Sequence, residues 1–179
     1  RVYHSGSGTA TAAISGSGGD PPITNSDEFD GSSWTAGGTM NTGRRHLNGN
    51  GPQTSAFVTG GYTGTNPTAA TEEYNGSSWS NGGNLNQTRY GISAGGSEPA
   101  GLAMGGGVPG SPNGIGYGPQ TAAKQVNGSA PPYQSTTFDY DGTVFSTAPA
   151  TANARGDGAG GGTDNTSGVV MGGYAPSAS

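Results

Sequence analysis

Four of the six basic residues of this chain are arginines that recur at nearly equivalent positions of a repeated sequence. They are Arg1, Arg44, Arg89 and Arg155. Their positive charges could together bind an anionic ligand. Recurrence has a second explanation, in which each arginine makes the same bond, to a backbone carbonyl or to an acid, in every copy of a repeat. The regular recurrence favours this structural explanation.

The acidic residues are placed as regularly as the arginines. Adjacent residues on a β-strand point to opposite faces of a sheet, so a pair such as Glu72-Glu73 does not form one bidentate calcium site. We therefore expect one acid of each pair to meet a repeated arginine and the other to face water. Seven of the eleven acids lie in the same part of the repeat: Asp27, Glu28, Asp30, Glu72, Glu73, Asp139 and Asp141.

No group of residues has the spacing of a metal site or a catalytic site. A zinc site needs about three converging protein ligands, and nothing near His4 or His46 supplies the others. The chain has no cysteine, which excludes disulfides, thiolate metal sites and cysteine nucleophiles. Nucleophile-elbow, zinc-helix and phosphate-loop motifs are also missing from the sequence. The sequence therefore predicts a protein that is not an enzyme, with no catalytic residue, metal or cofactor.

The composition excludes further classes of function. The formal charge of −5 and the pI near 4.6 argue against nucleic acid as a partner, because phosphates require a basic surface. No apolar run approaches the ~18 residues of a membrane span, so we expect no membrane partner. The 38 glycines and 12 prolines among 179 residues are typical of low-complexity sequence unless they are periodic. Because the sequence starts at Arg1 without a methionine or a secretory signal, we expect a processed chain or a fragment.

The glycines are periodic, because the sequence repeats itself after 45 residues. The segment that starts at Phe29 (FDGSSWTAGG) returns at Tyr74 as YNGSSWSNGG. A weaker third copy starts at Tyr140, and the N-terminus resembles half a copy. Residues 107–135 have no counterpart in the other copies and are predicted to be an insertion loop. Equivalent structural positions are Trp34, Trp79 and Phe145; Arg44, Arg89 and Arg155; and the pairs Gly60-Gly61 and Gly105-Gly106.

Each repeat is predicted to hold four short β-strands. Asn75-Gly76, between the third and fourth strands, predicts a type I′ hairpin in which both central residues have positive φ. The Gly-Gly pairs are predicted to allow a sharp turn or a close approach of neighbouring backbones. No ten-residue window has a helical period, so the predicted fold class is all-β. The four strands are exemplified by residues 89–94, 100–104, 71–74 and 77–80.

This order of features resembles Kelch-type repeats, in which an apolar run ending in Gly-Gly precedes an aromatic-plus-acid pair, a tryptophan and an arginine. The segments ATEEYNGSSWSNGGNLNQTRYG and GLAMGG are most similar to the glycine-rich Kelch-like repeats of marine phages, especially cyanophages. The resemblance implies short four-stranded antiparallel units, as in β-propeller blades. It implies one repeat domain over residues 1–179, with units at approximately 1–34, 44–79 and 89–145 and a half-unit at 155–174.

This number of units is smaller than the 4–8 blades of an ordinary propeller. We therefore expect a partial β-propeller or an open β-repeat array. The chain is either a fragment of a longer propeller, part of a ring that another copy completes, or an open array of stacked repeats. A free blade edge exposes unpaired strands, so we expect an assembly with other copies of the chain or with other virion proteins.

The resemblance implies a non-enzymatic structural or binding module of a phage virion, in a tail fibre, a tail or a head-associated protein. The expected location is the virion or the extracellular space. Tyrosine is a favoured contact residue on loops held by rigid scaffolds, so Tyr117 and Tyr133 in the insertion loop are candidates for binding a cell-surface glycan. A plain spacer is the other explanation of that loop. The alternative function is a secreted microbial adhesin or fibril subunit, and a carbohydrate-active enzyme is the third hypothesis.

Overall fold

The chain folds into short β-strands in the part that the structure describes. This computed structural model describes residues 2–97, 100–104, 106, 115–117, 123–126, 137–140, 145–150, 159–162 and 166–171. All named elements over these ranges are strands, which confirms the predicted all-β class. Within the same ranges, no helix has the length and apolar character needed to cross a membrane.

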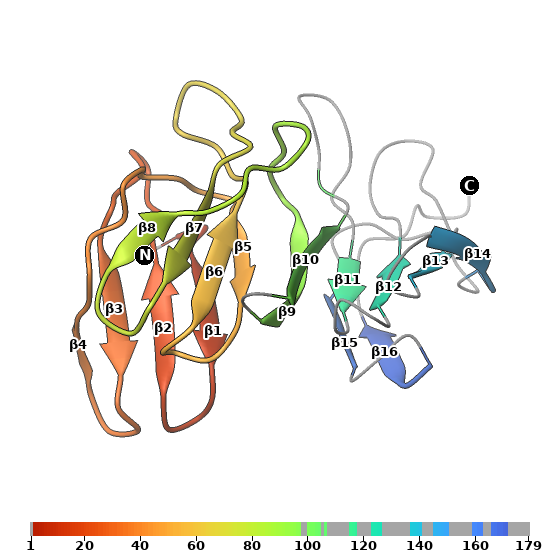
Figure 1. Ribbon diagram of the computed structural model, residues 1–179, viewed down its shortest axis with the longest axis horizontal. Helices are drawn as coiled ribbons and strands as arrows, with labels where there is room; N and C mark the ends of the chain where they lie inside the picture. The colour runs from red at the N-terminus through yellow and green to blue at the C-terminus, as the bar shows by residue number, and fades with distance from the viewer. Residues whose placement is uncertain are drawn as a thin grey trace, which may run out of the picture. The chain divides into compact units, whose positions relative to one another are not determined.

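The strands form antiparallel sheets in which chain neighbours are also sheet neighbours (Figure 1). Sheet 1 consists of β1 (Ser5–Gly8), β2 (Ala13–Gly16), β3 (Ser26–Phe29) and β4 (Trp34–Ala36). Sheet 2 consists of β5 (Asn48–Asn50), β6 (Ala56–Thr59), β7 (Thr71–Tyr74) and β8 (Trp79–Asn81). β9 (Ser93–Ser97) pairs with β10 (Ala100–Met104). A further four-stranded sheet holds β11 (Ile115–Tyr117), β12 (Ala123–Val126), β13 (Thr137–Tyr140) and β14 (Phe145–Ala148), and β15 (Ala159–Gly162) pairs with β16 (Gly168–Met171).

The chain divides into two compact units. The first contains Arg1–Tyr90 and Ser97–Gly101, and the second contains Gly91–Gly96 and Leu102–Ser179. Within the first unit, β1 lies against β5, so the opening strands of sheets 1 and 2 are neighbours. Within the second unit, β11 lies against β15 in the same way. None of the sheets formed by the described strands closes on itself.

A small apolar core fills the space between sheets 1 and 2. Gly16 makes room for it, because a Cβ at this position would lie 3.2 Å from the sulfur of Met40. Burying these side chains supplies the main favourable term for joining the two sheets. The buried cluster consists of Ile14, Met40, Leu47, Ala56, Val58, Tyr74 and Trp79.

The glycine pair after β6 has the role that the sequence predicts. Gly60 and Gly61 have φ angles of 60° and 102°, a region that glycine enters without steric cost. A Cβ on Gly61 would also lie 3.0 Å from the carbonyl oxygen of Arg45. The pair therefore serves both the turn and the close approach of two backbones. Gly106 has a φ of 76°, and Gly105 lies outside the described residues.

Two of the four exemplified strands have the predicted bounds, and two are shifted. β7 and β10 match the prediction. β8 begins at Trp79 rather than at Ser77, because the backbone N–H groups of Ser77 and Ser78 donate to the Asn75 side chain instead of to a neighbouring strand. β9 begins at Ser93 rather than at Arg89, because the backbone of Arg89 bonds to Thr68 and Gly61.

The hairpin between the third and fourth strands forms as predicted, but the type I′ turn is wrong. Gly76 has a φ of 92°, whereas Asn75 is not among the residues with positive φ. The Asn75 Oδ1 atom instead accepts the backbone N–H groups of Ser77 and Ser78, each at 3.0 Å. Such an Asx turn needs no left-handed first residue. In sheet 1 the same bonds, from the backbones of Ser33 and Ser32, lower the pKa of Asp30 to about 2.

The prediction that residues 107–135 form an insertion loop is wrong, because β11 and β12 lie inside this segment. β11 pairs with β12, and β12 pairs with β13, so the region predicted as one unit over 89–145 contains a two-stranded sheet followed by a four-stranded one. The pairing of β11 and β12 satisfies backbone N–H and C=O groups, which every non-proline residue carries. A search for repeated side chains does not detect them, since neither strand carries the repeat residues.

Candidate functional site

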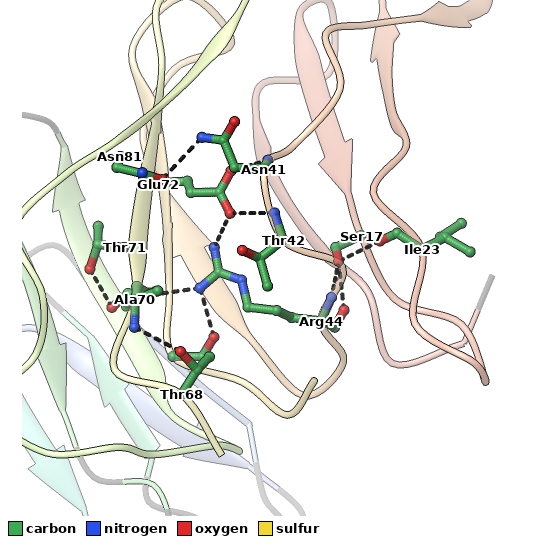
Figure 2. Close-up of polar contacts among 12 residues, drawn as sticks. Ser17, Ile23, Asn41, Thr42, Arg44, Thr68, Ala70, Thr71, Glu72 and Asn81 are labelled. Carbon is green, nitrogen blue, oxygen red and sulfur yellow. Dashed lines mark hydrogen bonds and ion pairs between the residues drawn. The ribbon is translucent and has the colours of Figure 1, made fainter. Parts of the chain in front are cut away.

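The repeated arginine Arg44 links sheet 1 to sheet 2 (Figure 2). Its Nη1 atom donates to the carbonyl oxygens of Gly60 at 2.9 Å and Ala70 at 2.6 Å. Its Nη2 atom donates to the Oε1 atom of Glu72 at 2.8 Å. The guanidinium therefore bonds to one strand end and to two positions around β7, all in sheet 2.

The backbone of Arg44 is fixed to sheet 1. Its N–H donates to the Ser17 hydroxyl at 2.7 Å, and its carbonyl accepts the N–H of Gly18 at 2.7 Å. The Ser17 hydroxyl lies within donor distance of two carbonyl oxygens, those of Ile23 at 2.8 Å and Arg44 at 2.6 Å. Arg44 is therefore held at its backbone by one sheet and at its side chain by the next.

Glu72 completes the link from the side of sheet 2. Besides the arginine, its carboxylate accepts the backbone N–H groups of Asn41 at 2.7 Å and Thr42 at 3.2 Å. The side chains of Arg44 and Glu72 are fully buried, at 0% and 1% exposure. Burial lowers the pKa of Arg44, and the neighbouring Glu72 carboxylate opposes this shift. For the pair Glu72-Glu73, the prediction that one acid meets a repeated arginine is confirmed, and Glu73, on the opposite face of β7, is only half-buried.

Two further polar contacts cross the same interface. The Tyr74 hydroxyl donates to the Glu28 carboxylate, and burial together with this bond raises the pKa of Tyr74 to about 12. The indole Nε1 of Trp79 donates to the Ser26 hydroxyl at 3.1 Å. Glu72, Tyr74 and Trp79 therefore form one docking face of sheet 2, which contacts sheet 1.

Arg89 holds the same backbone position in sheet 2 that Arg44 holds in sheet 1. Its carbonyl accepts the N–H of Gly61 at 2.7 Å, as that of Arg44 accepts the N–H of Gly18. Its side chain is partly exposed and donates to Gln87 at 3.1 Å. The repeat therefore preserves the bond that the arginine carbonyl accepts, whereas the N–H of Arg44 donates to the Ser17 hydroxyl and that of Arg89 donates to the carbonyl of Thr68.

The outer face of sheet 1 carries the residues equivalent to that docking face. Phe29 and Trp34 pair across β3 and β4, with ring centroids 5.1 Å apart and an interplanar angle of 36°. Tyr74 and Trp79 pair in the same register, at 4.9 Å and 39°. Trp34 is nevertheless 55% exposed, whereas Trp79 is 7% exposed. The two tryptophans thus hold the same position of the repeat, but Trp34 does not share the burial of Trp79.

An open pocket of about 380 Å³ lies beside Trp34 on this face. His4, Ser15 and Asp27 supply its polar groups, and Gly6 and Ala13 leave it shallow. An exposed indole beside hydroxyl, imidazole and carboxylate groups suits the binding of a partly apolar surface. Among the described residues, no three His, Asp or Glu side chains gather as metal ligands.

The structure leaves several predicted site residues without a described side chain. Tyr117 lies in β11 and Phe145 lies in β14, but their side chains are outside the described part. Tyr133 and Arg155 lie outside the described residues altogether. The sequence does not predict the pocket beside Trp34. The aromatic residue at the end of the third strand, Phe29 in sheet 1 and Tyr74 in sheet 2, is the repeated feature that marks this face of each sheet.

Comparison with known proteins bears on the fold. The sequence matches no protein-family model, and no curated protein matches it. Among solved structures, the chain is similar to the one titled "Structure of YjhT", with a TM-score of 0.62 and 13% sequence identity. The similarity covers 91% of this chain and 70% of that chain. At this level of identity, the likeness concerns the fold alone.

Proposed function

We propose that this chain is a non-enzymatic structural and binding module of a phage virion, in a tail fibre, a tail or a head-associated protein. In this proposal its sheets are the blades of a partial Kelch-like propeller or of an open repeat array. The outer face of sheet 1 is the surface through which the module assembles with another copy or with another virion protein. Cell-surface glycans are the second class of partner.

One observation carries the assembly role: Phe29 and Trp34 repeat the geometry of Tyr74 and Trp79, which dock onto a sheet. Large aromatic side chains dominate the energetics of protein interfaces. A half-exposed tryptophan in the register of a docking residue is therefore suited to receive another β-sheet. The Kelch-like sequence features that resemble phage repeats support the placement in a virion.

Sedimentation velocity of the purified chain across micromolar concentrations tests the assembly role. We expect reversible association, and the Trp34→Ala variant should associate at least about tenfold more weakly, since central interface aromatics commonly contribute this much. Tyr3→Gly is the matched control, because Tyr3 is 54% exposed but lies outside the pocket. A chain that stays monomeric throughout, or association that ignores Trp34, would remove the outer face of sheet 1 from the proposal.

Gold-labelled antibodies against the purified chain test the location. We expect label on virus particles that are purified by density gradient from cultures of the organism that carries the gene, at a fixed place on each particle. Label on free filaments or on cell surfaces, with bare particles in the same micrographs, would support the adhesin or fibril alternative instead.

A further inference from the structure

One repeated backbone position has a left-handed conformation in three copies. Tyr3 has a φ of 57°, His46 of 53° and Gly91 of 61°, and each lies two residues after a repeated arginine. A residue with a Cβ is strained in this region and glycine is not. Only the third copy has a glycine, Gly91, at this position, although glycine occurs 38 times in the chain. Strained residues of this kind cluster at functional sites, which directs attention to the side chains of Tyr3 and His46.

These two side chains begin a row of rings. The centroids of Tyr3 and His46 are 4.3 Å apart, and the His46 backbone N–H donates to the Tyr3 carbonyl at 3.1 Å. His46 lies 6.2 Å from Tyr90, and Tyr90 lies 6.1 Å from Tyr62. Tyr3 is 54% exposed, and the other three side chains are partly exposed. The rings therefore form an accessible aromatic platform within the first unit.

Polar groups border this platform. The guanidinium of Arg45 lies 5.4 Å from the centroid of Tyr62 and 2.5 Å from the Asp20 carboxylate. Burial, together with the positive charge of Arg45, lowers the pKa of His46, so its imidazole is neutral at neutral pH and offers one donor and one acceptor. The border thus combines donors and acceptors with a locally balanced charge.

We propose that this aromatic platform (Tyr3, His46, Tyr62 and Tyr90, with Arg45 and Asp20) binds a saccharide. The apolar face of a sugar ring packs on Tyr3, and the hydroxyls bond to the imidazole and to the ion pair. A mixed set of donors and acceptors beside rigid rings suits a polyol. A polyanion is a poorer ligand, because Asp20 neutralises Arg45 and the chain carries a charge of −5.

The inference gives a location to the glycan binding in the proposed function, and it rests on that function only to this extent. A chain that binds saccharides through the platform but is missing from virus particles would keep the inference and end the virion proposal. Antibody label on virus particles, together with a chain that binds no saccharide, would keep the virion proposal and end the inference about the platform.

The test uses the full chain on a printed array of oligosaccharides that end in glucose, galactose, N-acetylglucosamine or rhamnose, followed by calorimetric titration of the strongest binder. We expect Tyr3→Gly and His46→Gly each to weaken binding at least about tenfold, as loss of a central contact does. Neither variant should lower the melting temperature, because glycine relieves the left-handed strain. Tyr3→Phe, which keeps the ring, should bind within a few-fold of the parent chain.

Val2→Ala is the control, because it trims a comparably exposed apolar side chain that belongs neither to the platform nor to the assembly surface. It should leave saccharide binding unchanged. The proposal fails if no array member binds, if the two glycine variants bind as the parent does, or if they lose binding only because they melt earlier. Binding of proline-rich peptides in place of saccharides would also overturn it.

Discussion

The Arg44→Ala variant should lose about 3–5 kcal/mol of unfolding free energy, the range measured when one partner of a buried ion pair is removed. The change leaves the Glu72 carboxylate buried without its cation, at 1% exposure. It also takes the side-chain donor from the carbonyls of Gly60 and Ala70, and unpaired buried polar groups are costly. Because domains are stable by only about 5–15 kcal/mol, much of the stability of the first unit depends on this residue. Urea unfolding followed by circular dichroism measures the effect.

Arg89→Ala is the control that the repeat itself supplies. The carbonyl of Arg89 accepts a glycine N–H as that of Arg44 does, but the Arg89 side chain is partly exposed and donates to Gln87. We expect this change to cost less than Arg44→Ala, because the charge that it removes is partly exposed to water whereas that of Arg44 is fully buried. Equal losses for the two variants would mean that the buried pair with Glu72 is not the source of the stability.

Trp79→Ala has the second largest expected effect, a loss of about 3–5 kcal/mol, which is typical of removing a buried aromatic side chain. Trp79 is 7% exposed and packs with Tyr74 in the core between sheets 1 and 2. The variant also leaves the Ser26 hydroxyl without the indole N–H. Thermal unfolding followed by circular dichroism should show a large fall in the melting temperature.

Trp34→Ala is the matched control for Trp79→Ala, because it is the same substitution at the equivalent position of the other repeat. With 55% exposure, Trp34 should contribute about 0.5 kcal/mol or less to the stability of the monomer. The two variants should therefore differ several-fold in their loss of unfolding free energy. A loss at Trp34 as large as that at Trp79, measured where the chain is monomeric, would contradict the assigned exposure.

The sequence predicts those structural features that require the same residue type in each repeat. The acid pair in β7, the apolar run of β10 and the glycine pair after β6 each leave a signal, because each requires a particular residue type at that place. The strands β11 and β12 leave none, since their residues, IGY and AKQV, do not include those that recur in the other copies. The turn type was mistaken for a related reason: Asn75 suits both a type I′ turn and an Asx turn, and only the backbone angles separate them.

The candidate site was less predictable than the fold, because exposure depends on what lies opposite a residue. Trp34 and Trp79 occupy closely similar sequence surroundings, Ser-Ser-Trp after Asp-Gly or Asn-Gly. One of them faces a sheet and the other faces an open pocket. In the same way, Tyr3 and His46 are unremarkable in the sequence, and their significance comes from φ angles that no propensity forecasts.

The link between sheets 1 and 2 has a consequence for how the chain acquires its structure during synthesis. Arg44 leaves the ribosome before Glu72, with its backbone already able to bind to sheet 1 while its charge has no acid to meet. Until β7 has emerged, this guanidinium stays in water, and burying it early would be strongly unfavourable. The end of sheet 1 therefore stays exposed to solvent until β7 emerges, and it is covered only when the Glu72 carboxylate reaches the Arg44 guanidinium. Arg44 therefore couples the completion of sheet 1 to the arrival of β7, so these two neighbouring repeats fold as coupled units rather than singly.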